Sequence, residues 1–185
     1  MAARSSLCLL LCLGLSACTT AKDSGAEAAA PLSDPSTGLA ADPACEDFQG
    51  TAIPGATSYF VGTFDFDGST VTGEERWLLF ANDAWRAHGE DDCVVTWSVT
   101  GEQVAPSSGC GSCSYGLSVS AGVDASLTDC PEALYEGVEQ FTTQYDVKAA
   151  DGSATVYFPS GSVLGTGAES TSGVTYRSEG SCLYF

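Results

Sequence analysis

The chain has 185 residues, of which 24 are acidic and six are basic, and its formal net charge at pH 7 is −18. This negative excess excludes nucleic acid as a partner, because proteins bind it chiefly through lysine and arginine side chains that neutralise phosphates. It also disfavours direct adhesion of the protein surface to anionic lipid.

Residues 1–17 have the pattern of an export signal. One positive charge, Arg4, precedes the nine residues Leu7 to Leu15, which are almost entirely apolar. That stretch is far shorter than the ~20 residues that a membrane-spanning helix needs. Small residues follow it, up to Cys18. A basic start, a short apolar middle and a small-residue exit predict a cleaved signal peptide.

The tetrapeptide Leu15-Ser16-Ala17-Cys18 resembles the lipobox of the bacterial lipoprotein family. This resemblance implies cleavage before Cys18 and attachment of diacylglycerol and an acyl chain such as palmitate to Cys18. It implies a partner as well, the membrane of the cell envelope, which the protein contacts through its lipid anchor. Thr19 stands where Asp favours inner-membrane retention in the family, so the outer membrane is the expected location. The exported remainder resembles no family.

Residues 18–44 are predicted to be the lipidated cysteine and a flexible tether. The segment is rich in small residues, proline and acids, and it has no aromatic residue and no apolar periodicity. Such a composition buries too little apolar surface to offset the conformational entropy lost on folding. Residues 45–185 are then expected to form one domain, since about 140 residues suffice for a hydrophobic core.

The cysteines of the exported part predict disulfides. An even number in an exported domain favours a disulfide framework over free thiols, and six lie beyond the lipobox: Cys45, Cys93, Cys110, Cys113, Cys130 and Cys182. A hairpin of residues 94–100 and 114–123, centred near Pro106 and Ser107, would bring Cys93 close to Cys130. The other four cysteines are expected to form Cys45–Cys182 with Cys110–Cys113, or crosswise pairs.

The Cys110-Gly-Ser-Cys113 motif has two further interpretations. A redox-active motif of this kind needs a helix start that stabilises a thiolate, whereas the residues that follow Cys113 alternate like a strand. A structural zinc site needs more ligands than one Cys-x-x-Cys and the single histidine provide. A structural disulfide loop is therefore the favoured interpretation, and neither a metal nor a cofactor is expected.

Period-2 alternation dominates the domain and predicts half-buried strands. The apolar faces are formed by Phe60, Gly62, Phe64 and Phe66, by Cys93, Val95, Trp97 and Val99, by Tyr115, Leu117, Val119, Ala121 and Val123, and by Phe141, Thr143, Tyr145 and Val147. Shorter strand-like runs lie at residues 77–80, 154–158, 162–165, 174–177 and 182–185.

The connections support an antiparallel all-β fold. Asp67-Gly68 and Asp151-Gly152 are typical hairpin turn pairs, and one short helix is expected within residues 128–137, capped by Thr128 or Asp129. Strands with one polar face disfavour a parallel α/β sheet. The prediction is a single disulfide-stapled β-sandwich or small β-barrel of about seven to nine strands.

The sequence gives little support to a specific reaction, so whether the protein is an enzyme stays open. His88 is the only histidine and lies among polar residues, where a surface position is favoured over a catalytic base. No nucleophile elbow or phosphate-binding loop is present. Asp65 with Asp67, and residues 90–92, offer carboxylates suited to calcium, but solvated turn acids are the favoured interpretation. No catalytic residue and no metal ligand is assigned.

The aromatic residues give the remaining functional indication. A sugar-binding face or a barrel mouth could be lined by the three tryptophans and three of the tyrosines, although core packing is favoured for the group: Trp77, Trp85, Trp97, Tyr59, Tyr115 and Tyr157. Trp85 is expected to be the most exposed of the tryptophans, since a turn precedes it.

One function is favoured, with two alternatives. The favoured function is a lipid-anchored envelope module that binds a protein or a glycan. The second is a carrier of a small hydrophobic ligand, if the sheet closes into a hollow barrel. The third is an envelope hydrolase that uses two carboxylates. The oligomeric state is not predicted.

Overall fold

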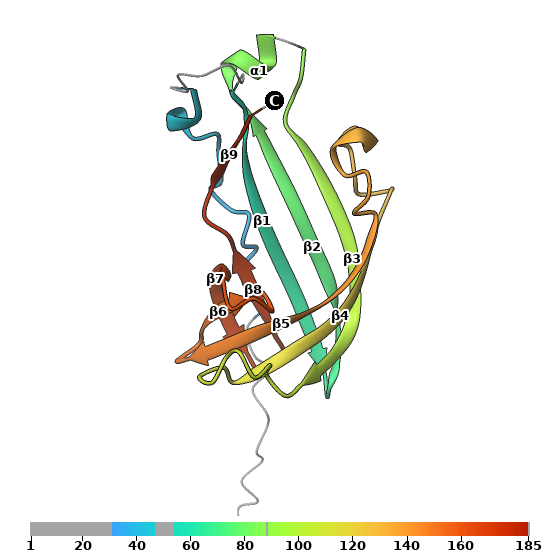
Figure 1. The fold of residues 1–185 in the computed structure, drawn as a ribbon, viewed down its shortest axis with the longest axis vertical. Coiled ribbons are helices and arrows are strands. Elements are labelled where there is room, and N and C mark those ends of the chain that lie inside the picture. Colours follow the sequence, from blue (N-terminus) through green and yellow to red (C-terminus); the bar gives the residue numbers. More distant parts are fainter. Residues whose placement is uncertain (1–30, 47–53, 88, 185) are drawn as a thin grey trace, which may run out of the picture.

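The computed structural model describes residues 31–46, 54–87 and 89–184, and these form an all-β barrel (Figure 1). Eight consecutive strands pair antiparallel, each with the next along the chain, and β8 returns to β1. They are β1 (Pro54–Asp67), β2 (Thr70–Ala81), β3 (Cys93–Val104), β4 (Tyr115–Val123), β5 (Gln140–Ala150), β6 (Ser153–Tyr157), β7 (Val163–Ser170) and β8 (Gly173–Arg177). The prediction of an antiparallel barrel is confirmed, and the sandwich alternative is wrong.

A ninth strand, β9 (Ser181–Tyr184), lies outside the closed circuit. The long strand β1 has one edge on β2, and its other edge is divided between two partners. Residues 61–65 pair with β8 and close the barrel, whereas residues 54–58 pair with β9. The long strands β1, β2 and β3 extend well past the short strands β6 to β8 (Figure 1).

The alternation seen in the sequence matches the burial of the side chains. The barrel core contains residues that are fully buried, among them Phe64, Val71, Val95, Leu117, Val147, Val156, Val174 and Tyr176. The polar residues between them, such as Asp65 and Ser98, are exposed. An apolar face toward the core and a polar face toward water is the expected pattern of an antiparallel barrel.

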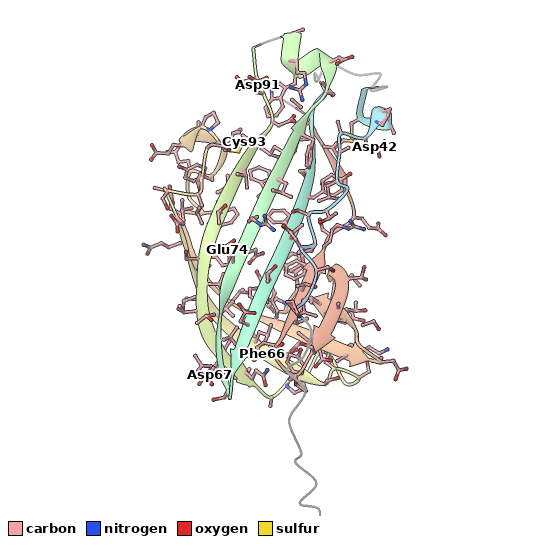
Figure 2. The ribbon with its side chains drawn as sticks, turned by 180° about the vertical axis from the view of Figure 1, so that it is seen from behind. Asp42, Phe66, Asp67, Glu74, Asp91 and Cys93 are labelled. Atoms are coloured by element: carbon pink, nitrogen blue, oxygen red, sulfur yellow. A yellow bond between two sulfur atoms is a disulfide. The ribbon has the colours of Figure 1, made fainter. Side chains whose placement is uncertain are left out.

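Two predicted turns close hairpins as expected. In the β5–β6 loop Asp151 and Gly152 have φ angles of 51° and 78°, the left-handed values that a type I′ turn requires at both central positions. In the β1–β2 loop Gly68 takes the left-handed position, with φ of 61°, directly after Asp67. Phe66 and Asp67 lie at this end of the barrel, and Asp91 and Cys93 lie toward its other end (Figure 2).

The β3–β4 hairpin differs from the prediction in register. Trp97 lies opposite Val123 and Val104 lies opposite Gly116, so the hairpin is centred at Cys110 instead of Pro106–Ser107. The strands end before the loop because residues 105–114 contain the short Cys110–Cys113 loop, which cannot continue the ladder. The arms are the predicted ones, but the loop between them is shifted toward the C-terminus.

Helix is scarce, and two short pieces were not expected. The region 128–137 contains only the 3₁₀ turn Glu132–Leu134. The α-helix α1 (Asp83–Ala87) and the 3₁₀ turn Pro43–Glu46 were not predicted. None of the helices in the described part of the chain is long and apolar enough to cross a membrane.

Three disulfides cross-link the described part of the chain. Cys93 bonds to Cys130, the pair that we expected from the hairpin, and Cys45–Cys182 occurs together with Cys110–Cys113. The crosswise alternatives are therefore not adopted. Cys45–Cys182 joins residues that are 137 positions apart and fixes the segment before β1 to β9.

Residues 31–44, assigned to the tether, lie against the barrel wall. Ala40 accepts a hydrogen bond of 3.1 Å from the Tyr59 hydroxyl, and the Asp42 amide donates one of 2.7 Å to Thr57 Oγ1. Asp34 forms an ion pair of 2.8 Å with Arg76. These contacts are polar and specific, which composition alone did not indicate.

Candidate functional site

A cavity of about 370 Å³ lies inside the barrel. Its walls come from β1, β2, β3, β5 and β7, together with the β4–β5 and β6–β7 connections. The lining residues are Phe60, Glu75, Trp77, Trp97, Leu134, Val138, Phe141, Thr143, Tyr145, Phe158 and Leu164. Ten of these residues contribute apolar or hydroxyl-bearing side chains, and the remaining one is an acid.

Glu75 is the one charged side chain among the described residues that line the cavity. It lies on the inward face of β2, two positions from Trp77, and is 4% exposed. The Tyr176 hydroxyl donates a hydrogen bond of 2.7 Å to its Oε1, and the Tyr145 hydroxyl lies 3.1 Å from Oε1 and 2.9 Å from Oε2. The carboxyl group is thus buried but hydrogen-bonded, as a buried polar group requires.

A glycine makes this arrangement possible. Glu75, Gly62 and Tyr176 lie in one row across β2, β1 and β8. A Cβ atom on Gly62 would lie 2.1 Å from Cε1 of Tyr176, far closer than van der Waals contact allows. Because Gly62 has no side chain, the Tyr176 ring lies over β1 and its hydroxyl reaches the carboxyl group of Glu75.

Burial controls the ionisation of this cluster. Desolvation raises the pKa of Glu75, although the hydrogen bonds from Tyr176 and Tyr145 oppose the rise. Desolvation and the neighbouring carboxyl group also raise the pKa of both tyrosines, which stay neutral. Since the folded protein holds the Glu75 proton more tightly than the unfolded chain, the contribution of Glu75 to stability falls as the pH rises from its ordinary pKa through the raised one.

Trp77, a lining residue, has an unsatisfied donor. Nε1 of Trp77 is buried and has no hydrogen-bond partner among the described residues. A buried indole N–H that lacks a partner carries a desolvation cost. Trp77 stacks on Phe60, with ring centroids 5.9 Å apart, so this wall of the cavity is aromatic.

The β4–β5 connection forms one side of the cavity mouth. The Trp97 indole donates a hydrogen bond of 2.9 Å to the Val138 carbonyl. The Cys93–Cys130 disulfide links the same connection to β3. Val138 is 48% exposed, and Phe158, from the β6–β7 connection, is 40% exposed. Because these large apolar side chains are both exposed and part of the cavity wall, they lie at the opening of the cavity.

The aromatic residues singled out in the sequence separate into two groups. Trp77 and Trp97 line the cavity, together with Phe60, Phe141 and Tyr145 of the predicted apolar faces. Tyr59, Tyr115 and Tyr157 are not among its lining residues. The expected exposure of Trp85 is wrong: its residue is 8% exposed, because Asn82 begins helix α1 through a bond from the Trp85 amide to Oδ1 and turns the indole into the core.

Several other predicted positions are not among the residues that line the cavity. Cys18 and the signal peptide, together with His88, lie outside the described residues. In the part of the chain that the structure describes, no three His, Cys, Asp or Glu side chains are grouped as metal ligands. Asp91 and Asp92 instead contact Arg86, at 3.3 and 2.6 Å.

Glu75 was missed at the sequence level. The strand was assigned only to residues 77–80, whereas β2 begins at Thr70. The signal was present, since Val71, Gly73, Glu75, Trp77 and Leu79 have the same parity along the strand and so share one face. An acid on an otherwise apolar strand face is a candidate buried site.

Comparison with known proteins adds no constraint, since no protein-family model, no curated protein and no solved structure matches this chain.

Proposed function

We propose that this protein binds a small, predominantly hydrophobic molecule inside its barrel. The observation that supports this proposal is the apolar cavity with the Glu75 cluster at its wall. Its volume of about 370 Å³ falls within the range of about 300–1,000 Å³ that is typical of ligand pockets. A mostly apolar lining with a few convergent polar groups is the usual composition of such pockets.

The alternatives receive less support. A glycosidase-type hydrolase needs two carboxyl groups in one cleft, and Glu75 is the single carboxyl group among the described lining residues. Asp146, a second buried acid, accepts hydrogen bonds from the Ser107 amide, at 2.8 Å, and from the Ser107 hydroxyl in the β3–β4 loop. An interaction module needs no internal cavity, so the cavity favours a carrier over a module that binds through its outer surface.

Filling the cavity is expected to abolish binding of an uncharged hydrophobic dye. Thr143 points into the cavity from the middle of β5, and Thr143→Trp places an indole in the space that a ligand would occupy. We expect Nile red to gain fluorescence when it is titrated with the native protein, with an affinity in the micromolar range, and Thr143→Trp to weaken that affinity at least ~30-fold, or about 2 kcal/mol. Fluorescence titration measures both.

Thr142→Trp is the matched control. Thr142 is the preceding residue of β5 and is exposed on the outer face, so it adds the same aromatic group without entering the cavity. We expect its affinity for Nile red to equal that of the native protein. Equal loss in both variants, or no gain of fluorescence with the native protein, would contradict the proposed function.

We further propose that the protein acts at the cell envelope, held by a lipid on Cys18. The lipobox residues Leu15-Ser16-Ala17-Cys18 support this proposal, and the three disulfides are consistent with an oxidising compartment. Two or more acyl chains give durable anchoring, since each buried CH₂ contributes about 0.8 kcal/mol.

Cys18→Ala is expected to release the protein from the membrane. In a bacterial host fed with radiolabelled palmitate, we expect the native precursor to be labelled and to sediment with membranes. The variant should be unlabelled and should not sediment. Label that persists in Cys18→Ala would show that Cys18 is not the attachment site.

A further inference from the structure

We propose that the ligand of the barrel is a hydrophobic amine, bound with its cationic nitrogen at Glu75 and its apolar body against the aromatic wall. This inference rests on the proposed function and names the class of ligand. It follows from three properties of the cavity: its single ionisable group is an acid, its walls are aromatic, and its described lining has no basic group.

The charge of the cavity selects against acids. The four basic residues in the described part of the chain, Arg76, Arg86, Lys148 and Arg177, are not among the residues that line the cavity. Arg76 and Arg86 form ion pairs with acids elsewhere, at Asp34 and at Asp91 and Asp92. A fatty acid or another organic anion would therefore place its charge beside Glu75 with no counter-charge in the described wall, which is unfavourable in an apolar site.

The same geometry suits a cation. The Tyr176 hydroxyl binds Oε1 of Glu75 at 2.7 Å, and the Tyr145 hydroxyl is shared between the two oxygens. Because an ionised carboxyl group has about four acceptor positions, these bonds leave capacity for one further donor. An ammonium group there would favour the ionised carboxylate and offset its desolvation, and hydrogen bonds between opposite charges are stronger than neutral ones.

The aromatic residues around Glu75 supply a second attraction. Trp77, Trp97, Phe60, Phe141 and Tyr145 line the same cavity. The face of an aromatic ring attracts a cation, most strongly for tryptophan and more strongly when the cation is desolvated. The net charge of −18 would also raise the local concentration of cations and lower that of anions around the protein.

Three naphthalene compounds of nearly equal size test this proposal: naphthylmethylamine, naphthylmethanol and naphthoic acid, which near pH 7 are a cation, a neutral molecule and an anion. Isothermal titration calorimetry with the full chain is expected to give the order amine, alcohol, acid, with the amine at least ~10-fold tighter than the alcohol. Glu75→Gln is expected to weaken amine binding by ~10- to 100-fold and alcohol binding by less than ~3-fold.

Glu74→Gln is the matched control. Glu74 is the neighbouring residue on β2 and is exposed on the outer face, halfway along the strand (Figure 2). The Glu74→Gln substitution also replaces a carboxyl group on β2 by an amide, but it does not change the cavity. We expect amine and alcohol affinities close to the native values, which separates a contact at Glu75 from the effect of the net charge.

The remaining outcomes overturn the inference. Equal affinities for amine and alcohol, tighter binding of the acid, or a Glu75→Gln variant that keeps the preference for the amine would each exclude an amine site at Glu75, while Nile red binding would still support the proposed function. Binding of Nile red without binding of any naphthalene compound would have the same meaning. If the native protein binds neither Nile red nor any naphthalene compound, the proposed function and this inference are refuted together.

Discussion

Joint replacement of Cys45 and Cys182 by alanine is expected to lower the free energy of unfolding by about 5 kcal/mol, the largest effect of any change proposed for this protein. In the chain-entropy model a disulfide stabilises by restricting the unfolded state, and its effect grows with the length of the loop it closes. Cys45 and Cys182 are 137 residues apart, compared with 37 for Cys93–Cys130 and three for Cys110–Cys113. Urea unfolding followed by circular dichroism measures the difference.

The Cys110→Ala/Cys113→Ala pair is the control, with an expected loss of less than about 2 kcal/mol, because the loop that it opens is short. The loss from Cys45 and Cys182 has a structural consequence as well, since this disulfide fixes the described segment before β1 to β9. Equal losses in the two double variants would contradict this account of how the barrel is stabilised.

Phe64→Ala is expected to cost about 3–5 kcal/mol of stability and to weaken ligand binding. Phe64 is 0% exposed, and its ring centroid lies 6.0 Å from that of Tyr176 and 6.3 Å from that of Tyr145. The substitution leaves a void beside the two tyrosines that hold Glu75, so they lose the packing that orients their hydroxyls. Thermal unfolding and Nile red titration of the same samples measure the two effects.

Phe158→Ala is the control for the stability effect of Phe64→Ala. Phe158 lines the cavity but is 40% exposed, so its removal is expected to change stability by less than about 1 kcal/mol. A Phe64→Ala variant as stable as Phe158→Ala would show that the interior of the barrel repacks freely. That outcome would contradict the expectation that Phe64 packing orients the two tyrosines beside Glu75.

Local patterns predicted the strands well. The alternation from Phe60 to Phe66 and from Phe141 to Val147 placed the correct side chains inside, because period 2 is a property of the strand backbone itself. The Asp151-Gly152 turn was predictable for a similar reason, since left-handed φ angles at two successive positions favour these residue types.

Closure of the sheet was not predictable from these patterns. It depends on the pairing of residues 61–65 with residues 173–177, at opposite ends of the domain. A sandwich would place the same alternating faces in its core, so the sequence pattern is the same for both architectures. The hollow that follows from closure, and with it the choice between a carrier and a surface-binding module, therefore could not be read from the strands.

Two errors have different causes. Trp85 was expected to be exposed because a turn precedes it, but Asn82 is an N-cap residue, and the short helix that it begins returns the indole to the core. Glu75 was overlooked because the strand was started at residue 77, and its partners, Tyr145 and Tyr176, are 70 and 101 residues away. A buried acid is acceptable only with such partners, and their positions are known only once the barrel has closed.

Native mass spectrometry of the folded, oxidised domain with excess Nile red tests the central claim most directly, because it counts the molecules held by each barrel. The account predicts one bound Nile red on the native protein and on Thr142→Trp, lost on denaturation, and none on Thr143→Trp. A native protein that stays unliganded, or a Thr143→Trp variant that still carries one molecule, would contradict the claim that the cavity of the barrel is a binding site.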